Sequence, residues 1–166
     1  MQDAFAELHR SRRGHGIADA EGGRQADFAV RCWFFATHVA FIDDDGQAYL
    51  YFGGNGDHNV RVAKLNRDMI SLDGEVIKMY ATNFFEAAWV FKTNGVYYFT
   101  YSTTPRAQMR IDYLTGDSPT NFTYRGIVGE QPPINNNNNH AAEFQFKGRW
   151  YHVYHNRIVA KQAGIP

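Results

Sequence analysis

The sequence contains a single cysteine, Cys32, and no long apolar run. One cysteine excludes an intrachain disulfide framework and any metal cluster built on several thiolates. No run of about 18 apolar residues occurs, so we expect no transmembrane helix. Residues 1–15 also lack the apolar segment of a secretory signal, and no signal peptide is visible.

The charge balance has no excess of either sign. The 166 residues include 17 Lys and Arg and 17 Asp and Glu, which gives a formal net charge of zero. We therefore expect neither nucleic acid nor a membrane surface as a partner. Aromatic residues are plentiful instead, with 13 Phe, 10 Tyr and 3 Trp beside 15 Gly. This composition favours an all-β protein with many tight turns, a sugar-binding surface, or both.

The composition and residue pattern of the chain change near residue 36. Residues 1–36 contain five Arg and no Lys, and they show neither strand-like alternation nor a clean helical stripe. We interpret 1–36 as an atypical segment, disordered or translated out of frame. A basic tail is the alternative, although the Ala, Gly and Phe content is not that of a charged arm. Residues 37–166 alternate strands with turns and form the predicted folded domain.

A repeat runs through this second part. Each copy is a short strand, a polar turn with glycine and a strand rich in aromatics, which are the signals of a β-hairpin. The three copies are residues 41–52, 90–101 and 144–154.

The spacing of the repeat predicts a β-propeller. The turn glycines Gly46, Gly95 and Gly148 lie 49 and 53 residues apart, close to the length of a four-stranded propeller blade. Residues 60–65 and 109–114 are the expected third strands, and residues 75–79 and 124–128 the expected fourth strands. The chain then holds about three blades, the last incomplete. Three blades do not close a ring, so we expect either an oligomer or, because the chain ends just after a hairpin, a fragment.

One carboxylate, Glu86, lies inside an otherwise apolar run, residues 82–91. Ionising a carboxyl group among aromatic side chains is costly. A carboxyl group that keeps its proton near neutral pH is what a general acid needs. The alternative is a glutamate at a strand edge whose neighbours belong to the core.

Residues 41–160 resemble glycoside hydrolase family 43, in particular the arabinoxylan arabinofuranohydrolases and related β-xylosidases. The stretches that carry the resemblance are residues 41–54, 83–89, 95–103, 139–140 and 154–157. The resemblance implies a five-bladed β-propeller with its active site at the axis, and hydrolysis with inversion. It also implies that Glu86 is the general acid.

The family uses two further carboxylates, and both lack a counterpart here. The resemblance implies a base aspartate in a first blade, which is absent. It also implies a modulating aspartate in an Asp-Pro pair, where this chain has Thr37-His38. Asp43, Asp44 and Asp45 are tempting substitutes, but we interpret them as solvated turn residues.

The mismatch at Thr37 has a genetic explanation. The codons of Ala36, Thr37 and His38 are GCN, ACN and CAN. If the third bases of the first two codons are G and C, a reading frame that starts two bases later contains GAC and CCA, which encode Asp-Pro. We therefore predict that much of residues 1–36 is out-of-frame translation and that the genuine frame resumes near Val39.

The resemblance implies further site residues. His140 matches an axial histidine that in many relatives lies near a central calcium ion, although calcium prefers oxygen ligands and one histidine makes a weak metal site. Arg157 is expected to contact a sugar hydroxyl or a carboxylate, or else to form a surface ion pair. Phe85 and Trp89 are expected to stack on pentose rings, or else to belong to the blade core.

Taken together, the sequence predicts part of an inverting α-L-arabinofuranosidase or β-xylosidase that acts on xylan or arabinoxylan. It requires no cofactor, with calcium as a candidate ion, and the fragment is expected to be impaired. A carbohydrate-binding module is expected in the intact protein, which a polysaccharide substrate places outside the cell or in the periplasm. The alternatives are a sugar-binding propeller without catalysis and an inactive gene remnant.

Overall fold

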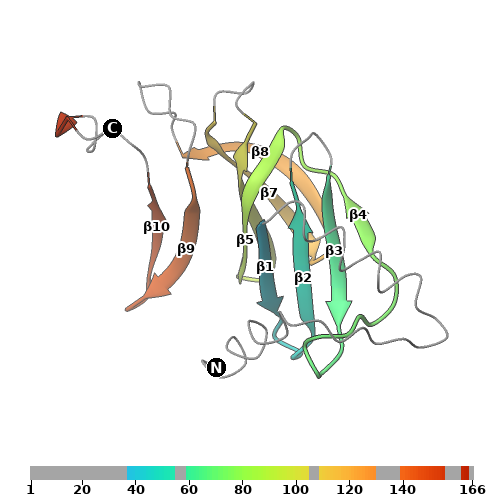
Figure 1. The fold of residues 1–166 in the computed structure, drawn as a ribbon. Helices are drawn as coiled ribbons and strands as arrows, with labels where there is room; N and C mark the ends of the chain where they lie inside the picture. Colours follow the sequence, from blue (N-terminus) through green and yellow to red (C-terminus); the bar gives the residue numbers. More distant parts are fainter. Residues whose placement is uncertain (1–36, 55–58, 105–108, 130–138, 156–161, 165–166) are drawn as a thin grey trace. The chain divides into compact units, whose positions relative to one another are not determined.

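The computed structural model describes residues 37–54, 59–104, 109–129, 139–155 and 162–164. All of them belong to one unit, Phe35–Pro166. Residues 1–36, for which the sequence predicts an atypical or out-of-frame segment, lie outside the described residues. The described part is built from antiparallel strands (Figure 1), which confirms the predicted all-β class.

The first sheet has four strands in sequential order. Its strands are β1 (Thr37–Ile42), β2 (Ala48–Gly53), β3 (Val60–Leu65) and β4 (Ile77–Met79). The turn between β1 and β2 closes because the Gly46 amide donates to the Asp43 carbonyl at 2.9 Å. Gly46 has a φ of 84°, a conformation that glycine adopts without strain.

The second sheet repeats this topology. Its strands are β5 (Phe84–Thr93), β6 (Val96–Thr103), β7 (Ile111–Ser118) and β8 (Asn121–Gly129). β5 and β6 are joined by Asn94-Gly95, whose φ angles of 52° and 75° are those of a two-residue hairpin turn with both residues left-handed. β7 begins two residues later and ends four residues later than the predicted third strand, and β8 extends the predicted fourth strand at both ends. In the first sheet, β4 is two residues shorter than the predicted strand 75–79.

A third unit begins with the hairpin of β9 (Ala141–Phe146) and β10 (Arg149–Tyr154). β5 contacts β1 on one side and β9 on the other, so the first strands of the three units are neighbours. The described residues therefore contain two complete four-stranded blades and the first half of a third. This confirms the predicted arrangement of about three blades.

The main core lies between the two four-stranded sheets. Tyr51, Phe84, Phe99 and Tyr101 have no exposed surface, and their rings pack on one another at centroid distances of 5.6–6.3 Å. The Tyr51 hydroxyl also donates to the Pro119 carbonyl at 2.6 Å, which ties the first sheet to the β7–β8 turn. Aromatic side chains thus pack one blade on the next, as the composition predicts.

The turn aspartates differ from one another in the structure. Asp44 and Asp45 are exposed as predicted. The prediction of a solvated residue is wrong for Asp43, whose side chain is 9% exposed and forms an ion pair with Lys92 at 2.8 Å. Burial raises the pKa of Asp43, but hydrogen bonds from Lys92, Tyr97 and the Asp44 amide outweigh it, and the net pKa is lowered. Asp43 therefore joins the turns of two neighbouring hairpins.

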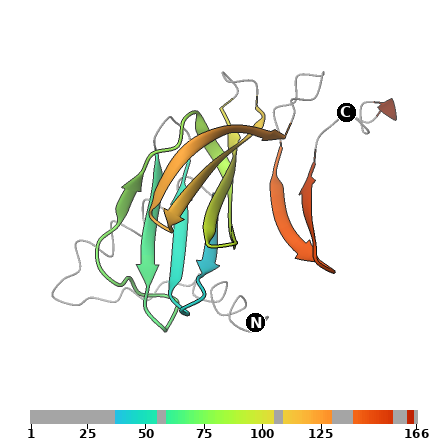
Figure 2. The ribbon, with the colours of Figure 1, turned by 180° about the vertical axis from the view of Figure 1, so that it is seen from behind.

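The two faces of the β9–β10 hairpin have different surroundings (Figure 2). On one face, Trp150 packs on Phe91 of β5 at 4.7 Å between ring centroids. On the opposite face, Phe144 and Tyr151 stack on each other at 5.5 Å and are 44% and 41% exposed. The alternation of a β-strand places these two sets of side chains on opposite faces.

Candidate active site

Glu86 lies between two irregularities at the start of β5. The ladder to β6 pairs Phe84 with Thr103, Glu86 with Ser102 and Trp89 with Thr100. Each interval has one more residue on β5 than on β6, so a β-bulge flanks Glu86 on either side. Bulges of this kind redirect side chains, and here they interrupt the alternation of β5 around its only carboxylate.

The backbone around Glu86 adopts unusual conformations. Ala87 has a φ of 59° and Asn83 a φ of 57°. Asparagine tolerates the left-handed region, but alanine adopts it rarely and at a cost of about 1 kcal/mol or more. As a result, the buried residues of β5 near its start recur every third position, at Phe84, Ala87 and Val90, instead of every second.

Neighbouring strands hold this irregular segment in place. The Tyr101 hydroxyl donates to the Thr82 carbonyl at 2.7 Å, and the Thr104 amide donates to the Asn83 carbonyl at 2.9 Å. Glu86 itself is half-buried. Within the described ranges no side chain or amide forms a hydrogen bond or ion pair with its carboxyl group. This carboxyl group therefore has no described partner that competes with a ligand.

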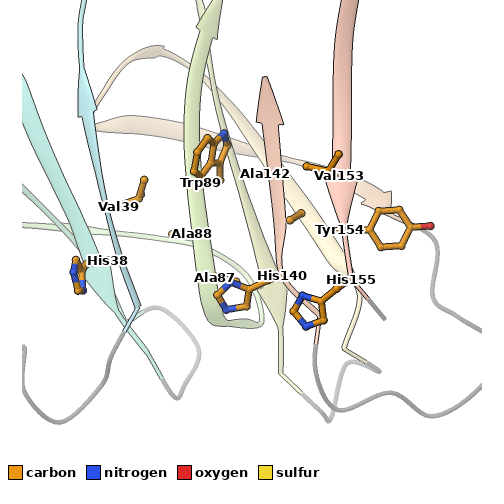
Figure 3. A pocket seen from close by; sticks show the side chains of 11 residues that line it. His38, Val39, Ala87, Ala88, Trp89, His140, Ala142, Val153, Tyr154 and His155 are labelled. Atoms are coloured by element: carbon orange, nitrogen blue, oxygen red, sulfur yellow. The ribbon is translucent and has the colours of Figure 1, made fainter. Parts of the chain in front are cut away.

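A pocket of about 550 Å³ is lined by the three residues that follow Glu86 on β5, although Glu86 itself is not among the lining residues. Figure 3 shows the side chains that line it. Its walls come from β1, β5, the start of β9 and the end of β10. The lining residues are His38, Val39, Ala87, Ala88, Trp89, His140, Ala141, Ala142, Val153, Tyr154 and His155. Because β1, β5 and β9 are the first strands of their units, the pocket lies where a propeller has its axis.

The structure brings two of the four predicted sugar-binding residues to this pocket. Trp89 and His140 line it, whereas Phe85 is half-buried outside the lining. Arg157 lies outside the described residues. Thr37 begins β1 and pairs with Gly53. The next residue, His38, lines the pocket, although the sequence analysis assigned its side chain no binding role.

The metal role of His140 stays a prediction. The His140 and His155 rings stack at a centroid distance of 5.9 Å, and the His155 amide donates to the His140 carbonyl at 3.2 Å. Nowhere in the described part do three or more His, Cys, Asp or Glu side chains gather as metal ligands. Two imidazoles do not fit calcium, which prefers several oxygen ligands. We therefore derive no step that involves a metal ion.

A buried polar group behind Trp89 was not predicted. The Trp89 indole nitrogen donates to the Glu143 carbonyl at 2.9 Å. The carboxylate of Glu143 accepts a hydrogen bond from Thr100 and lies 2.7 Å from Nδ1 of His152. The sequence carried no signal for it, because a strand glutamate that alternates with Ala142 and Phe144 is ordinarily expected to face solvent.

Comparison with known proteins assigns the chain and its fold to one family. The sequence model of glycosyl hydrolases family 43 matches residues 38–164. The chain belongs to glycosyl hydrolase family 43. The resemblance expected from the sequence is thus confirmed, and β1–β4 and β5–β8 are two blades of a family whose members are five-bladed β-propellers.

Three relatives illustrate the similarity within family 43. An arabinoxylan arabinofuranohydrolase from Paenibacillus polymyxa is 36% identical over 152 residues, which cover 78% of this chain and 24% of the relative. A solved α-L-arabinofuranosidase from Clostridium thermocellum is 53% identical with a TM-score of 0.69, covering 77% of this chain and 43% of that protein. A solved β-xylosidase/α-arabinofuranosidase from a compost metagenome, in a calcium-free form with xylotriose, is 29% identical with a TM-score of 0.64, covering 76% of this chain and 50% of that protein.

The chain thus spans about a quarter to a half of the length of these family 43 relatives. Among its described residues, no helix is long and apolar enough to cross a membrane.

Proposed function

We propose that this chain carries the acid-bearing part of an inverting glycoside hydrolase that removes pentose units from arabinoxylan or xylan. The observation that carries the proposal is the setting of Glu86 on a family 43 scaffold. It is a half-buried carboxyl group without a described partner, set between two bulges and directly before three residues, Ala87, Ala88 and Trp89, that line the axial pocket.

In this mechanism Glu86 donates its proton to the glycosidic oxygen as the bond to the sugar breaks. A second carboxylate, about 6.5–9.5 Å from the first, removes a proton from the water that attacks the opposite side of the ring. The water oxygen forms the new bond to the anomeric carbon as the glycosidic oxygen leaves with the proton of Glu86. Nothing is oxidised or reduced, so the proposed reaction requires no cofactor.

The pocket offers suitable surfaces for a pentose. Trp89 and Tyr154 present aromatic rings, which pack on the apolar face of a sugar. His140 and His155 present ring nitrogens that hydrogen-bond to hydroxyl groups. The arabinofuranosidase and xylosidase relatives support a pentose substrate. A polysaccharide of this kind is too large to enter a cell, so we expect the enzyme outside the cell or in the periplasm.

A further part of the proposal concerns how fast this chain turns over substrate. By the resemblance, Thr37-His38 stands where the family has an Asp-Pro pair, and threonine carries no charge with which to tune Glu86. We therefore expect binding to be better preserved than hydrolysis.

A second candidate function is sugar binding without catalysis. One observation favours it: among the described residues, the lining of the pocket contains three imidazoles and two aromatic rings but no carboxylate. Such a surface binds a sugar without the pair of carboxyl groups that hydrolysis needs.

Replacement of Glu86 by glutamine tests both candidates. The matched control is Glu75→Gln, at an exposed glutamate outside the pocket lining. Hydrolysis of xylobiose and of an arabinoxylan oligosaccharide is compared with that of a dinitrophenyl pentoside, whose leaving group needs no protonation. A general acid predicts a loss of roughly 10²–10⁴-fold on the natural linkages and little change on the dinitrophenyl substrate. Glu75→Gln should change neither.

Other outcomes separate the alternatives. Saturable xylotriose binding, without turnover and insensitive to Glu86→Gln, would favour the sugar-binding propeller. A chain with neither binding nor a cooperative unfolding transition would contradict both candidates and favour an inactive gene remnant.

A further inference from the structure

We propose that Glu143 is a positioning residue of the pocket. Thr100 and His152 hold its side chain, and its carbonyl oxygen in turn holds the Trp89 indole in place. This inference rests on the proposed function only for its effect on sugar binding. The argument depends on a buried polar seam between the second blade and the β9–β10 hairpin. We define the seam as Thr100, Ser102, Asn139, Glu143 and His152.

The Glu143 carboxylate is bound from two different strands. It is 7% exposed. One oxygen, Oε2, accepts a hydrogen bond from the hydroxyl of Thr100 on β6 at 2.9 Å. The other, Oε1, lies 2.7 Å from Nδ1 of His152 on β10. A buried carboxylate is costly without such partners, so these contacts fix where Glu143 lies.

The backbone carbonyl of Glu143 connects this anchored side chain to the pocket. Its carbonyl oxygen accepts the hydrogen bond of the Trp89 indole nitrogen at 2.9 Å, and Trp89 lines the pocket. A tryptophan side chain is rotated by two torsion angles, and this bond restricts both. The position of the carbonyl depends on the side chain of the same residue, because β9 has only one strand partner within the described ranges.

The rest of the seam holds the other side of the pocket. Ser102 lies two residues after Thr100 on β6, and its hydroxyl donates to the carbonyl of Asn139. The Asn139 side-chain amide donates to the Met109 carbonyl at 2.8 Å. Asn139 directly precedes His140, which lines the pocket. The same face of β6 thus fixes the start of β9 at two points.

The seam is poorly suited to stabilise the fold alone. Nε2 of His152 and Oδ1 of Asn139 are buried and find no hydrogen-bond partner in the described part of the chain. Each unpartnered buried polar atom costs about 1–3 kcal/mol. An apolar contact between the blade faces would avoid this cost. Polar residues that fix a geometry at such a cost fit a positioning role.

Another carboxylate cluster offers a matched control. Asp43, Lys92 and Tyr97 also join neighbouring hairpins through a largely buried carboxylate, but none of the three lines the pocket. Asp43→Asn and Glu143→Gln therefore make the same chemical change at two inter-hairpin contacts. Only the second is expected to alter the pocket.

The experiment measures hydrogen exchange of the Trp89 indole by NMR, with the resonance assigned by Trp89→Phe, and xylotriose binding by calorimetry. Glu143→Gln is expected to accelerate exchange of the Trp89 indole hydrogen about tenfold or more and to weaken xylotriose binding about tenfold, the effect of one hydrogen bond to a charged group. Asp43→Asn is expected to change neither. Thr100→Val should produce a smaller effect in the same direction, and Thr100→Ser should restore the wild-type values.

Unchanged indole exchange in Glu143→Gln and Thr100→Val would overturn the inference, as would an equal change in Asp43→Asn. A chain that binds no xylotriose but whose Trp89 indole responds to Glu143→Gln would refute the proposed function and support the positioning role.

Discussion

The hairpins β1–β2 and β5–β6 each begin a four-stranded blade, but they differ in regularity. β1 and β2 pair without interruption, from Thr37 with Gly53 to Ile42 with Ala48. β5 and β6 pair in the same way only between Trp89 and Thr93 on β5, and the ladder is broken on both sides of Glu86. The irregularity is confined to the end of the hairpin that carries the candidate acid.

This difference shows that the irregular, less stable backbone geometry is confined to the segment around Glu86. A regular strand is more stable, but it directs every second side chain to the same face. Two bulges and a left-handed alanine give β5 another pattern, and the surrounding core maintains it. We infer that the packing of Phe84 and Tyr101 compensates for the strain near Glu86. Four predictions test this comparison.

The largest effect is expected for Phe84→Ala, which removes the buried ring at the start of the bulged segment. Phe84 has no exposed surface and packs on Phe99 and Tyr101. We expect a loss of about 3–5 kcal/mol in the free energy of unfolding, measured by denaturant titration. Phe41→Ala in the regular hairpin, where the ring is only half-buried, should cost roughly half as much or less. Equal losses would contradict the special role of Phe84.

Ala87→Val tests the strain directly. Valine is disfavoured at a φ of 59°, and the site is 5% exposed. We expect a loss of about 1–3 kcal/mol in the free energy of unfolding. Ala40→Val, at an exposed position of regular β1, should change it by less than about 0.5 kcal/mol. Ala87→Gly should be neutral or stabilising. A destabilised glycine variant would show that Ala87 is not strained.

Tyr101→Phe tests whether the hydroxyl holds the segment before Glu86. The substitution removes the hydrogen bond to the Thr82 carbonyl and should cost about 1 kcal/mol. It should also weaken xylotriose binding, measured by calorimetry, because the bulged segment lines the pocket. Tyr98→Phe, on the same strand but without a described hydrogen bond from its hydroxyl, is the control and should change neither quantity. Equal effects of the two variants would count against the prediction.

The smallest effect is expected for Asp43→Asn, at the contact between the two hairpins. The pKa of Asp43 is lowered in the folded state, so the unfolded state binds more protons as the pH falls. The stabilisation from this carboxylate is therefore complete above its ordinary pKa and is lost as the pH falls through the lower folded value. The free energies of unfolding of the wild-type protein and Asp43→Asn, measured by denaturant titration between neutral pH and about pH 2, should become equal at the acidic end. A difference between the two free energies that stays constant to the lowest pH would contradict this account.

Much of the fold follows from local sequence patterns. The three hairpins were predictable because their turns contain Asp-Gly, Asn-Gly or Lys-Gly sequences between aromatic strands. The site was predictable in part. Glu86 and Trp89 share one short stretch, but the convergence of His38, His140 and His155 depends on strands far apart in the chain.

The bulges beside Glu86 were not predictable, because register depends on the partner strand and on the core, not on the residues of β5 alone. The ion pair of Asp43 escaped prediction for a similar reason, since a turn aspartate is normally solvated and Lys92 lies on another hairpin. Glu143 was overlooked because its burial becomes apparent only when the hairpin packs on β6.

The sequence by itself determined the all-β class and the hairpin repeat, because turn propensity and side-chain alternation are local properties. It offered Glu86 as the candidate acid, rather than as a glutamate at a strand edge, only through the resemblance to family 43. Tertiary structure alone decided which side chains meet at the pocket and which carboxylates are buried and paired. Those outcomes depend on contacts between strands separated by tens of residues, which no local pattern encodes.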